Sequence, residues 1–193
     1  MDEGAWLHFL TTDEARLAAA DLVAQADRLQ WADKHFRQEL ARWIRAKGDQ
    51  ARDGIPAHDA GVQDWLSFAG PLLVRSFDRG GGVAARDRDI AEHSPVLAVL
   101  GTDKEDWASW LAAGQALQHL LLKARSENVW ASFLCQPVEI VELRAPLADL
   151  AGHEGSPQVL LRLGYGPDVP PAPRRSPREM LIQHEHKHDP GHP

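Results

Sequence analysis

Apolar residues recur at offsets of three and four positions in several segments of the chain, and this spacing predicts helices. The first helix follows the threonine and aspartate residues at 11–13, which are good N-caps, and extends to about residue 29. A second helix is predicted from its apolar positions at residues 36–44 and is expected to end near Gly48. Further helices are predicted over residues 84–92 and from Pro137 onward. The longest is predicted over residues 103–126. Its core-facing positions are Trp107, Trp110, Leu111, Gly114, Leu117, Leu121 and Ala124.

Short apolar runs predict four strands, at residues 71–77, 95–102, 128–134 and 158–165. The second run is apolar throughout, so we expect it to be buried on both faces. Residues 46–61 are polar and contain glycine, which is typical of a loop. We expect the glycines at 80–82 to lie in a mobile loop, since no Gly-Lys-Ser/Thr phosphate-loop ending follows them. The order of elements predicts an α+β fold: a small mixed β-sheet flanked by helices, with a long central helix.

The composition is that of one soluble domain, predicted to span residues 1–182 and to end in a disordered histidine-rich tail, residues 183–193. The net charge of −7 argues against a nucleic-acid or membrane-surface binder. The single cysteine excludes an intramolecular disulfide. No run approaches the ~20 apolar residues that cross a bilayer, and the acidic start does not resemble a signal peptide. We therefore expect a cytoplasmic protein.

The tail carries His184, His186 and His188 in alternation, and neutral imidazoles bind nickel, copper or zinc. A specific site needs ligands held by a folded frame, which the tail lacks, so adventitious binding is expected and no metal site is predicted. The chain has no Gly-x-Ser-x-Gly nucleophile elbow. No catalytic acid, base or nucleophile is predicted, and Cys135 is expected to be a buried apolar residue.

Two adjacent arginines, Arg174 and Arg175, follow a proline-rich segment at residues 170–173. Guanidinium groups match the geometry of phosphate, and the prolines restrict the backbone that carries them. The pattern therefore allows a phosphate clamp. Taken alone, the pattern favours a solvated linker in the extended polyproline form.

The order of several weak motifs resembles the C-terminal half of the flavin-dependent nitroreductase family, and most closely its Acg-like branch. The matching stretches are VLAVLGT, the long helix, NVWASFLCQPVE, PQVLLRLGYGP and PRRSPREML. Members of that branch are longer chains in which two nitroreductase-like halves mimic the usual dimer. The resemblance covers residues 94–181 and extends back toward Trp6.

The resemblance implies FMN held between two subunits or two halves. Arg175, just before Ser-Pro, matches a residue that contacts the flavin phosphate, with Arg174 as the second choice. A strand-to-helix turn would lie beside the reactive edge of the flavin ring. Its residues here are Ser132, Phe133, Leu134, Cys135 and Gln136.

The sequence departs from the family pattern at two points. Leu134 and Cys135 replace the usual Glu-Gly pair, whose glycine lets the backbone approach the flavin. A serine flanked by arginines, which supplies much of the phosphate binding in the family, is not found before Thr11. A full flavin site is therefore expected to need a partner chain, and we expect pairing with a second copy or with an N-terminal half-domain.

The function implied by the resemblance is that of an FMN-associated oxidoreductase, in which NAD(P)H reduces the flavin and the flavin reduces a nitro or quinone-like acceptor. The alternative is a non-catalytic protein that binds or sequesters flavin, or a module that pairs with another chain through the long helix. Whether the chain is an enzyme stays open at this point. The expected partners are flavin and a nicotinamide nucleotide, with neither nucleic acid nor membrane.

Overall fold

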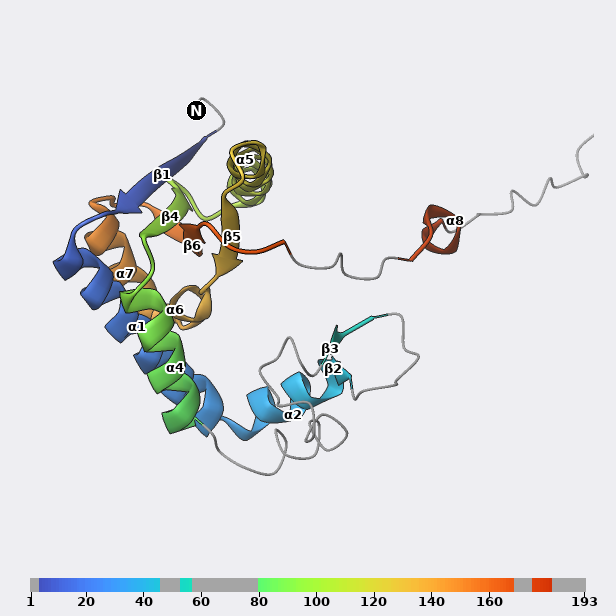
Figure 1. The fold of residues 1–193 in the computed structure, drawn as a ribbon, viewed down its shortest axis with the longest axis horizontal. Helices are drawn as coiled ribbons and strands as arrows, with labels where there is room; N and C mark the ends of the chain where they lie inside the picture. The colour runs from blue at the N-terminus through green and yellow to red at the C-terminus, as the bar shows by residue number, and fades with distance from the viewer. Residues whose placement is uncertain (1–3, 46–52, 57–79, 169–174, 182–193) are drawn as a thin grey trace, which may run out of the picture.

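A four-stranded antiparallel sheet forms the centre of the protein in a computed structural model that describes residues 4–45, 53–56, 80–168 and 175–181 (Figure 1). Its strand order is β1-β4-β6-β5. The strands are β1 (Ala5–Leu10), β4 (Val96–Thr102), β6 (Ser156–Gly164) and β5 (Trp130–Phe133). All three pairings in this sheet are antiparallel. The predicted α+β class is confirmed.

β4 is the most deeply buried strand because β1 and β6 pair with its two edges and helices cover both of its faces. Leu97, Ala98, Val99 and Leu100 are all 0% exposed, which confirms the burial expected from the apolar run. β1 was not predicted from the sequence. Its side chains are mostly half-buried, so its apolar pattern is too weak to distinguish a strand from a loop.

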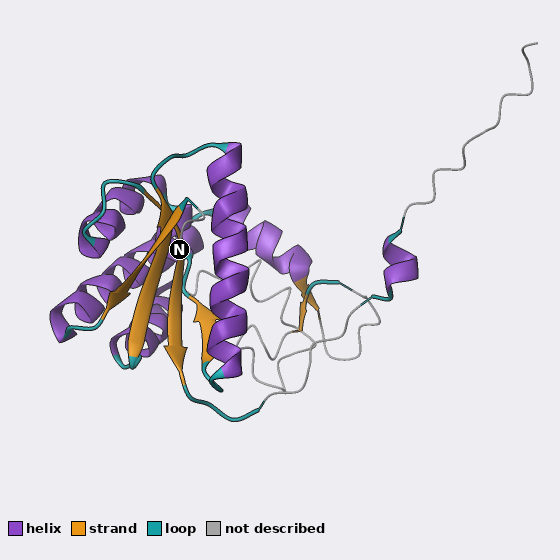
Figure 2. Ribbon diagram, turned by 90° about the horizontal axis from the view of Figure 1, so that it is seen from above, coloured by secondary structure: helices purple, strands orange, loops and turns teal. Residues whose placement is uncertain are grey.

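Helices cover both faces of the sheet (Figure 2). One face carries α5 (Trp107–Ser126), which packs on β4, β5 and β1. The other face carries α1 (Asp13–Ala32), α6 (Gln136–Glu139) and α7 (Val141–Ala151). Thr12 caps α1 by accepting a hydrogen bond from the amide of Ala15, as its position predicted. The main core lies between these helices and the sheet.

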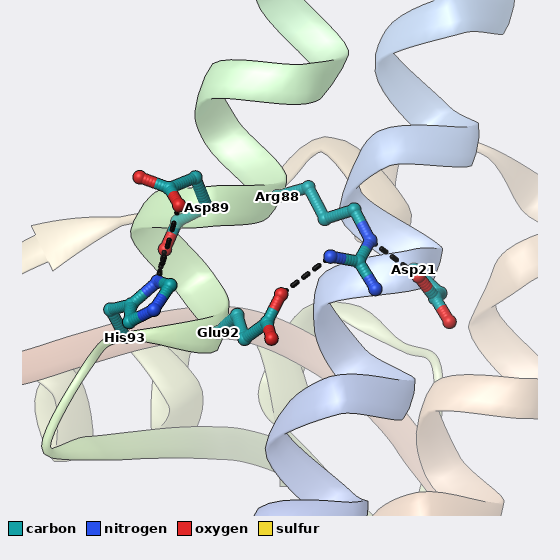
Figure 3. Close-up of polar contacts among 5 residues, drawn as sticks. All are labelled: Asp21, Arg88, Asp89, Glu92 and His93. Atoms are coloured by element: carbon teal, nitrogen blue, oxygen red, sulfur yellow. Dashed lines mark hydrogen bonds and ion pairs between the residues drawn. The ribbon is translucent and has the colours of Figure 1, made fainter.

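A long helix pair lies beside this core, where α4 (Gly80–Glu92) packs along α1. Arg88 joins the two helices: its Nε donates to Asp21 at 2.7 Å, and its Nη1 donates to Glu92 at 2.5 Å (Figure 3). The prediction of a loop at residues 80–82 is wrong, since these glycines form the first turn of α4. Packing on α1 offsets the poor helix propensity of glycine, which local sequence cannot reveal.

Smaller elements extend from the end of α1. Asp33 caps α2 (Lys34–Trp43), which ends before the predicted Gly48 because Ile44 begins β2 (Ile44–Arg45). β2 pairs in parallel with β3 (Ile55–Pro56), and Ile44 packs with Trp31 in a second, small core. The remaining helix is α8 (Pro177–Met180). The strand predicted at 71–77 and the tail at 183–193 lie outside the described residues.

The long helix α5 presents a different face to the sheet than the sequence predicted. Its N-cap is Asp106, and its fully buried positions are Ala113 and Ala116. Trp107 is 84% exposed and Leu111 is 66% exposed, so the expected core-facing stripe points outward in part. Small alanines let the helix lie close to β4, and this turns the bulky residues toward solvent. No helix in the described ranges is both long and apolar enough to cross a membrane.

Candidate functional site

A hollow of about 350 Å³ lies where β5 begins and β6 ends, beside the start of β4. This volume is within the range of ligand pockets in proteins, about 300–1,000 Å³. Its floor comes from the two strands, and its rim comes from the segment that follows β6. The lining residues are Ser94, Pro95, Trp130, Ala131, Ser132, Arg162, Leu163, Gly164, Tyr165, Gly166 and Pro167.

The charged group in this lining is Arg162, which sits directly opposite Ser132 in the β5–β6 register. Directly opposed residues project from the same face of a sheet, so the two side chains leave it side by side. Together they offer donors suited to an anionic or carbonyl-bearing ligand. Arg162 was not predicted as a site residue from the sequence. The feature of the sequence that could have identified it is its position as the single charged residue in the largely apolar strand QVLLRLG.

The segment after β6 is fixed to the body of the protein by Trp130. The indole Nε1 of Trp130 donates to the carbonyl of Gly166 at 3.1 Å, and the Arg125 guanidinium lies 3.9 Å above the ring. Arg125 also pairs with Asp168 at 2.9 Å. The chain is therefore held in place up to Asp168 as it leaves the hollow.

The two clamp arginines are placed as follows. Arg174 lies outside the described residues, and Arg175 is exposed just before α8. α8 lies apart from the sheet (Figure 1), so the structure does not bring Arg175 against the turn that follows β5. Contact of either arginine with a flavin phosphate stays a prediction.

The structure keeps the five predicted ring-side residues together. Ser132 and Phe133 end β5, and Phe133 is 53% exposed. The amide of Leu134 donates to the carbonyl of Leu160 at 2.9 Å, while its side chain is buried in the core. The Leu134 amide is therefore already engaged within the protein.

Cys135 follows in the same turn and is half-buried. Its Sγ lies 3.6 Å from the carbonyl of Leu160, and burial raises the pKa of the thiol. A thiol with a raised pKa stays protonated at neutral pH and is a poor nucleophile. This agrees with the apolar role expected for Cys135.

Gln136 turns its side chain toward the α1–α4 pair. Its Nε2 donates to Asp87 Oδ2 at 3.1 Å. Burial is the largest cause that raises the pKa of Asp87, and Arg86 and Arg162 act against it. Asp27 lies close by with only 2% of its surface exposed, and its pKa is raised to about 7, first by burial and then by Asp87. This buried acid pair was not foreseen, because its members come from α1 and α4.

No group of three or more histidine, cysteine, aspartate or glutamate residues in the described part of the chain is arranged to hold a metal ion. The histidines at 184, 186 and 188 lie outside the described residues. The hollow where β5 begins and β6 ends is suited to binding a ligand. It offers the Arg162 cation, the Ser132 hydroxyl and the aromatic rings of Trp130 and Tyr165.

No family model matches the chain. Among curated proteins, it resembles Rv3131 of Mycobacterium tuberculosis, named as a candidate NAD(P)H nitroreductase, at 32% identity over 174 residues. That match covers 84% of this chain and 49% of the relative. Acg of the same organism, with the same kind of name, is 28% identical, covering 86% of this chain and 48% of Acg. An uncharacterized protein, Rv3127, is 25% identical over 92% of this chain and 50% of its own length.

The chain thus spans about half the length of the curated relatives it matches. Among solved structures, the fold is similar to that of the FMN and NADPH-dependent nitroreductase NfnB from sphigopyxis sp. strain HMH. The TM-score is 0.54 at 16% identity, and the match covers 94% of this chain and 80% of NfnB. At this identity the likeness concerns the fold alone.

Proposed function

The chain is related to the nitroreductases in both sequence and fold, and we propose that it is part of an FMN-associated oxidoreductase that uses NAD(P)H to reduce nitro or quinone-like acceptors. The observation that carries the proposal is the hollow between the start of β5 and the end of β6, which Arg162 and Ser132 both line. The matched relatives named as candidate NAD(P)H nitroreductases support the same reaction class. Because the chain spans half of their length, a partner chain or second half completes the site in this proposal.

The residues around the hollow fit one side of such a cofactor. Arg162 supplies a positive charge for the phosphate or the N1–C2 carbonyl edge, and the hydroxyl of Ser132 supplies a second donor. Gly164 and Gly166 add no side chain to the rim, to which Trp130 and Tyr165 contribute aromatic rings. When bound, FMN supplies two-electron transfer from the nicotinamide to the acceptor. The protein's part is to bind, orient and shield that group, and it needs no catalytic acid or base of its own.

Flavin loading tests this proposal directly. The purified protein is incubated with FMN and desalted, and its visible absorption is recorded. We expect the wild type to keep a flavin band, and Arg162→Ala to lose about tenfold or more in affinity, since a hydrogen bond to a charged group contributes ~1.5–3 kcal/mol. Arg162→Lys keeps the charge and should recover part of the loss. Arg42→Ala, an exposed arginine on α2, is the matched control.

The outcomes separate the alternatives. Bleaching of the retained band by NADPH, followed by reoxidation with a nitro or quinone acceptor, indicates an enzyme. A stable yellow protein that NADPH does not bleach indicates flavin sequestration. A wild type that retains no flavin at any loading concentration contradicts the proposal for this chain. Arg175→Ala, measured in parallel, decides whether the predicted clamp contributes.

A second candidate function is pairing through α5, and the exposed apolar face of that helix favours it. Trp110, Leu111, Gly114, Gln118 and Leu122 line a hollow of about 520 Å³ on this face. Trp107 is 84% exposed, Leu111 66% and Leu122 61%. Contiguous apolar surface of this kind is typical of an interface.

We propose a second copy of this fold as the occupant. Gly114 lies mid-way along the face, and an added Cβ there would meet nothing within 4 Å. Bulky residues flank it on both sides, Trp110 and Leu111 before it and Leu122 after it. An isologous contact needs such a self-complementary surface, on which the first half of one helix meets the second half of its partner. The doubled length of the curated relatives is consistent with two such units in one protein.

We expect the protein to dimerise with rising concentration in sedimentation velocity, and Leu111→Glu to weaken dimerisation at least tenfold. A buried, unpaired carboxylate at the centre of an apolar interface is costly, which is the reason for the expected size. Leu29→Glu, at a 48% exposed position on α1, is the control and should leave dimerisation unchanged. A wild type that stays monomeric at the highest concentration, or equal behaviour of the two variants, contradicts the pairing role.

A further inference from the structure

Two buried oxygen atoms behind the turn at residues 134–136 lack any hydrogen-bond partner. They are Oδ2 of Asp27 and Oε1 of Gln136. A carboxylate oxygen and an amide oxygen are both hydrogen-bond acceptors, so neither can satisfy the other. An unsatisfied buried polar atom costs about 1–3 kcal/mol, which makes two such atoms in one place unusual.

The surrounding contacts bring these atoms into one small polar group. Gln136 Nε2 donates to Asp87 Oδ2 at 3.1 Å, and the Gln136 side chain also interacts with the carboxyl of Asp27. Asp27 is 2% exposed and lies on the side of α1 that faces Asp87 of α4 and Gln136 of α6, away from bulk water. The nearby Gln30 is occupied elsewhere, because its Nε2 donates to Glu139 at 2.7 Å.

A single added proton gives both unpaired oxygen atoms a hydrogen-bond partner. With a proton on Oδ2, Asp27 becomes a donor to the oxygen of the Gln136 amide, and the nitrogen of the same amide continues to donate to ionised Asp87. The amide is then used in both directions, once as acceptor and once as donor. Two carboxyl groups this close, and this well shielded, do not both ionise readily, so the protonated form of one of them is favoured.

We propose that Asp27, Asp87 and Gln136 form a buried proton-binding site, in which Asp27 holds the proton and the Gln136 amide fixes the β5–α6 turn to the α1–α4 pair. Asp27 and Asp87 act here as positioning residues. The proposal does not depend on flavin binding, since all three side chains belong to the apo protein. Loss of the proton leaves two carboxylates facing one amide, and the turn is then held less firmly.

The charged groups around this site set the direction of its pH response. Burial and Asp87 raise the pKa of Asp27 to about 7, and they outweigh the opposing effects of Gln136 and Arg28. Asp87 is moderated by Arg86 of α4 and Arg162 of β6. From α6, Glu139 faces the same region and is bonded to Gln30. The guanidinium groups of Arg86 and Arg162 favour ionisation of Asp87, so the proton stays on Asp27.

The sign of the stability change follows from linkage. Asp27 titrates near 3.8 when unfolded and near 7 when folded, so the folded state holds the extra proton between those values. The contribution of this site to stability is therefore complete below about pH 4 and decreases as the pH rises to about 7. The folding equilibrium constant should fall by up to tenfold per pH unit in that window.

Asp27→Asn tests the proposal because asparagine has the shape of a protonated aspartate and keeps a donor in place of Oδ2. Urea unfolding between pH 5 and 8.5 is compared for the wild type, Asp27→Asn and the exposed control Asp149→Asn. We expect the wild type and Asp149→Asn to lose stability as the pH rises. Asp27→Asn should lose the part of this dependence due to one proton, and it should exceed the wild type in stability at pH 8.5.

Two further measurements use the wild type and so do not depend on how the variant folds. Carbon-13 NMR of the aspartate side chains should show one buried carboxyl that titrates near neutral pH. Hydrogen exchange, corrected for the intrinsic rate, should show protection of the amides of residues 134–136, 138 and 139 that decreases above neutral pH. An Asp27 carboxyl already ionised at pH 5 overturns the proposal. Identical pH slopes for Asp27→Asn and the wild type also overturn it.

Discussion

Gly101→Ala is expected to destabilise the protein by about 3 kcal/mol, because overpacking of a core commonly costs ~1–3 kcal/mol and here the obstacle is a large ring. A Cβ at residue 101 would lie 2.1 Å from the nearest atom of the Trp6 ring. Trp6 and Gly101 are direct partners in the β1–β4 register, so the indole lies over the glycine. The ring has little room to move, because its other neighbours hold it.

Trp6 is confined from two further directions. His153 stacks on the indole with a centroid distance of 4.2 Å and an interplanar angle of 2°. Gly155 also approaches it, since a Cβ there would come within 2.8 Å of the Trp6 Nε1 and 2.3 Å of the Thr102 carbonyl oxygen. An alanine at 101 must therefore displace the ring, the histidine or the strand. Urea unfolding followed by circular dichroism measures the cost.

A double-mutant cycle identifies the cause. Trp6→Leu removes the ring, so the additional cost of Gly101→Ala should fall by at least about 1 kcal/mol in that background, which is typical of residues in contact. Gly82→Ala is the control, since nothing lies within 4 Å of an added Cβ in this exposed turn of α4. It should be stabilising by about 0.5–1 kcal/mol, the usual difference between glycine and alanine in a helix. Equal costs with and without Trp6 would sink the explanation.

Leu160→Ala is expected to lower the free energy of unfolding by about 3 kcal/mol or more. Replacing a buried leucine by alanine leaves a cavity and usually costs ~2–5 kcal/mol of stability. Leu160 is 0% exposed on β6 and packs in the main core with Leu97, Val99 and Leu147. Its carbonyl also accepts from the amide of Leu134, which ties the turn after β5 to the sheet. Because the side chain fills the space below that turn, the variant should also loosen residues 134–136.

The expected readouts are a lower urea midpoint with an unchanged slope, and faster hydrogen exchange at residues 134–136. Leu29→Ala, at a 48% exposed position on α1, should change stability by less than about 0.5 kcal/mol, as surface changes usually do. If Leu160→Ala were no more costly than this control, the position of Leu160 in the core would be wrong.

The sequence by itself determined the elements whose signal is local. The run VLAVLGT is apolar at nearly every position, and it forms the buried strand β4. Thr12 is a good N-cap directly before a periodic helix, and it caps α1. The ordered series of weak motifs was sufficient to indicate the family resemblance, with which the curated relatives and the solved fold agree.

The tertiary structure decided everything that depends on which face an element presents. α5 has apolar residues almost all round, so periodicity could not indicate that Ala113 and Ala116 face the sheet while Trp107 and Leu111 face outward. The three glycines that begin α4 form a helix because α1 lies alongside, and no local propensity favours that outcome.

The same reason applies to the candidate sites. Ser132 and Arg162 are 30 positions apart in the sequence, and they become neighbours only through the β5–β6 register. Asp27, Asp87 and Gln136 come from three helices, and each one alone resembles an ordinary surface residue in the sequence. Their unusual chemistry arises from burial and from one another's charge. Local sequence fixes the type of a side chain, but the surrounding solvent and charges are set by chain segments distant in sequence, and only the folded structure brings those together.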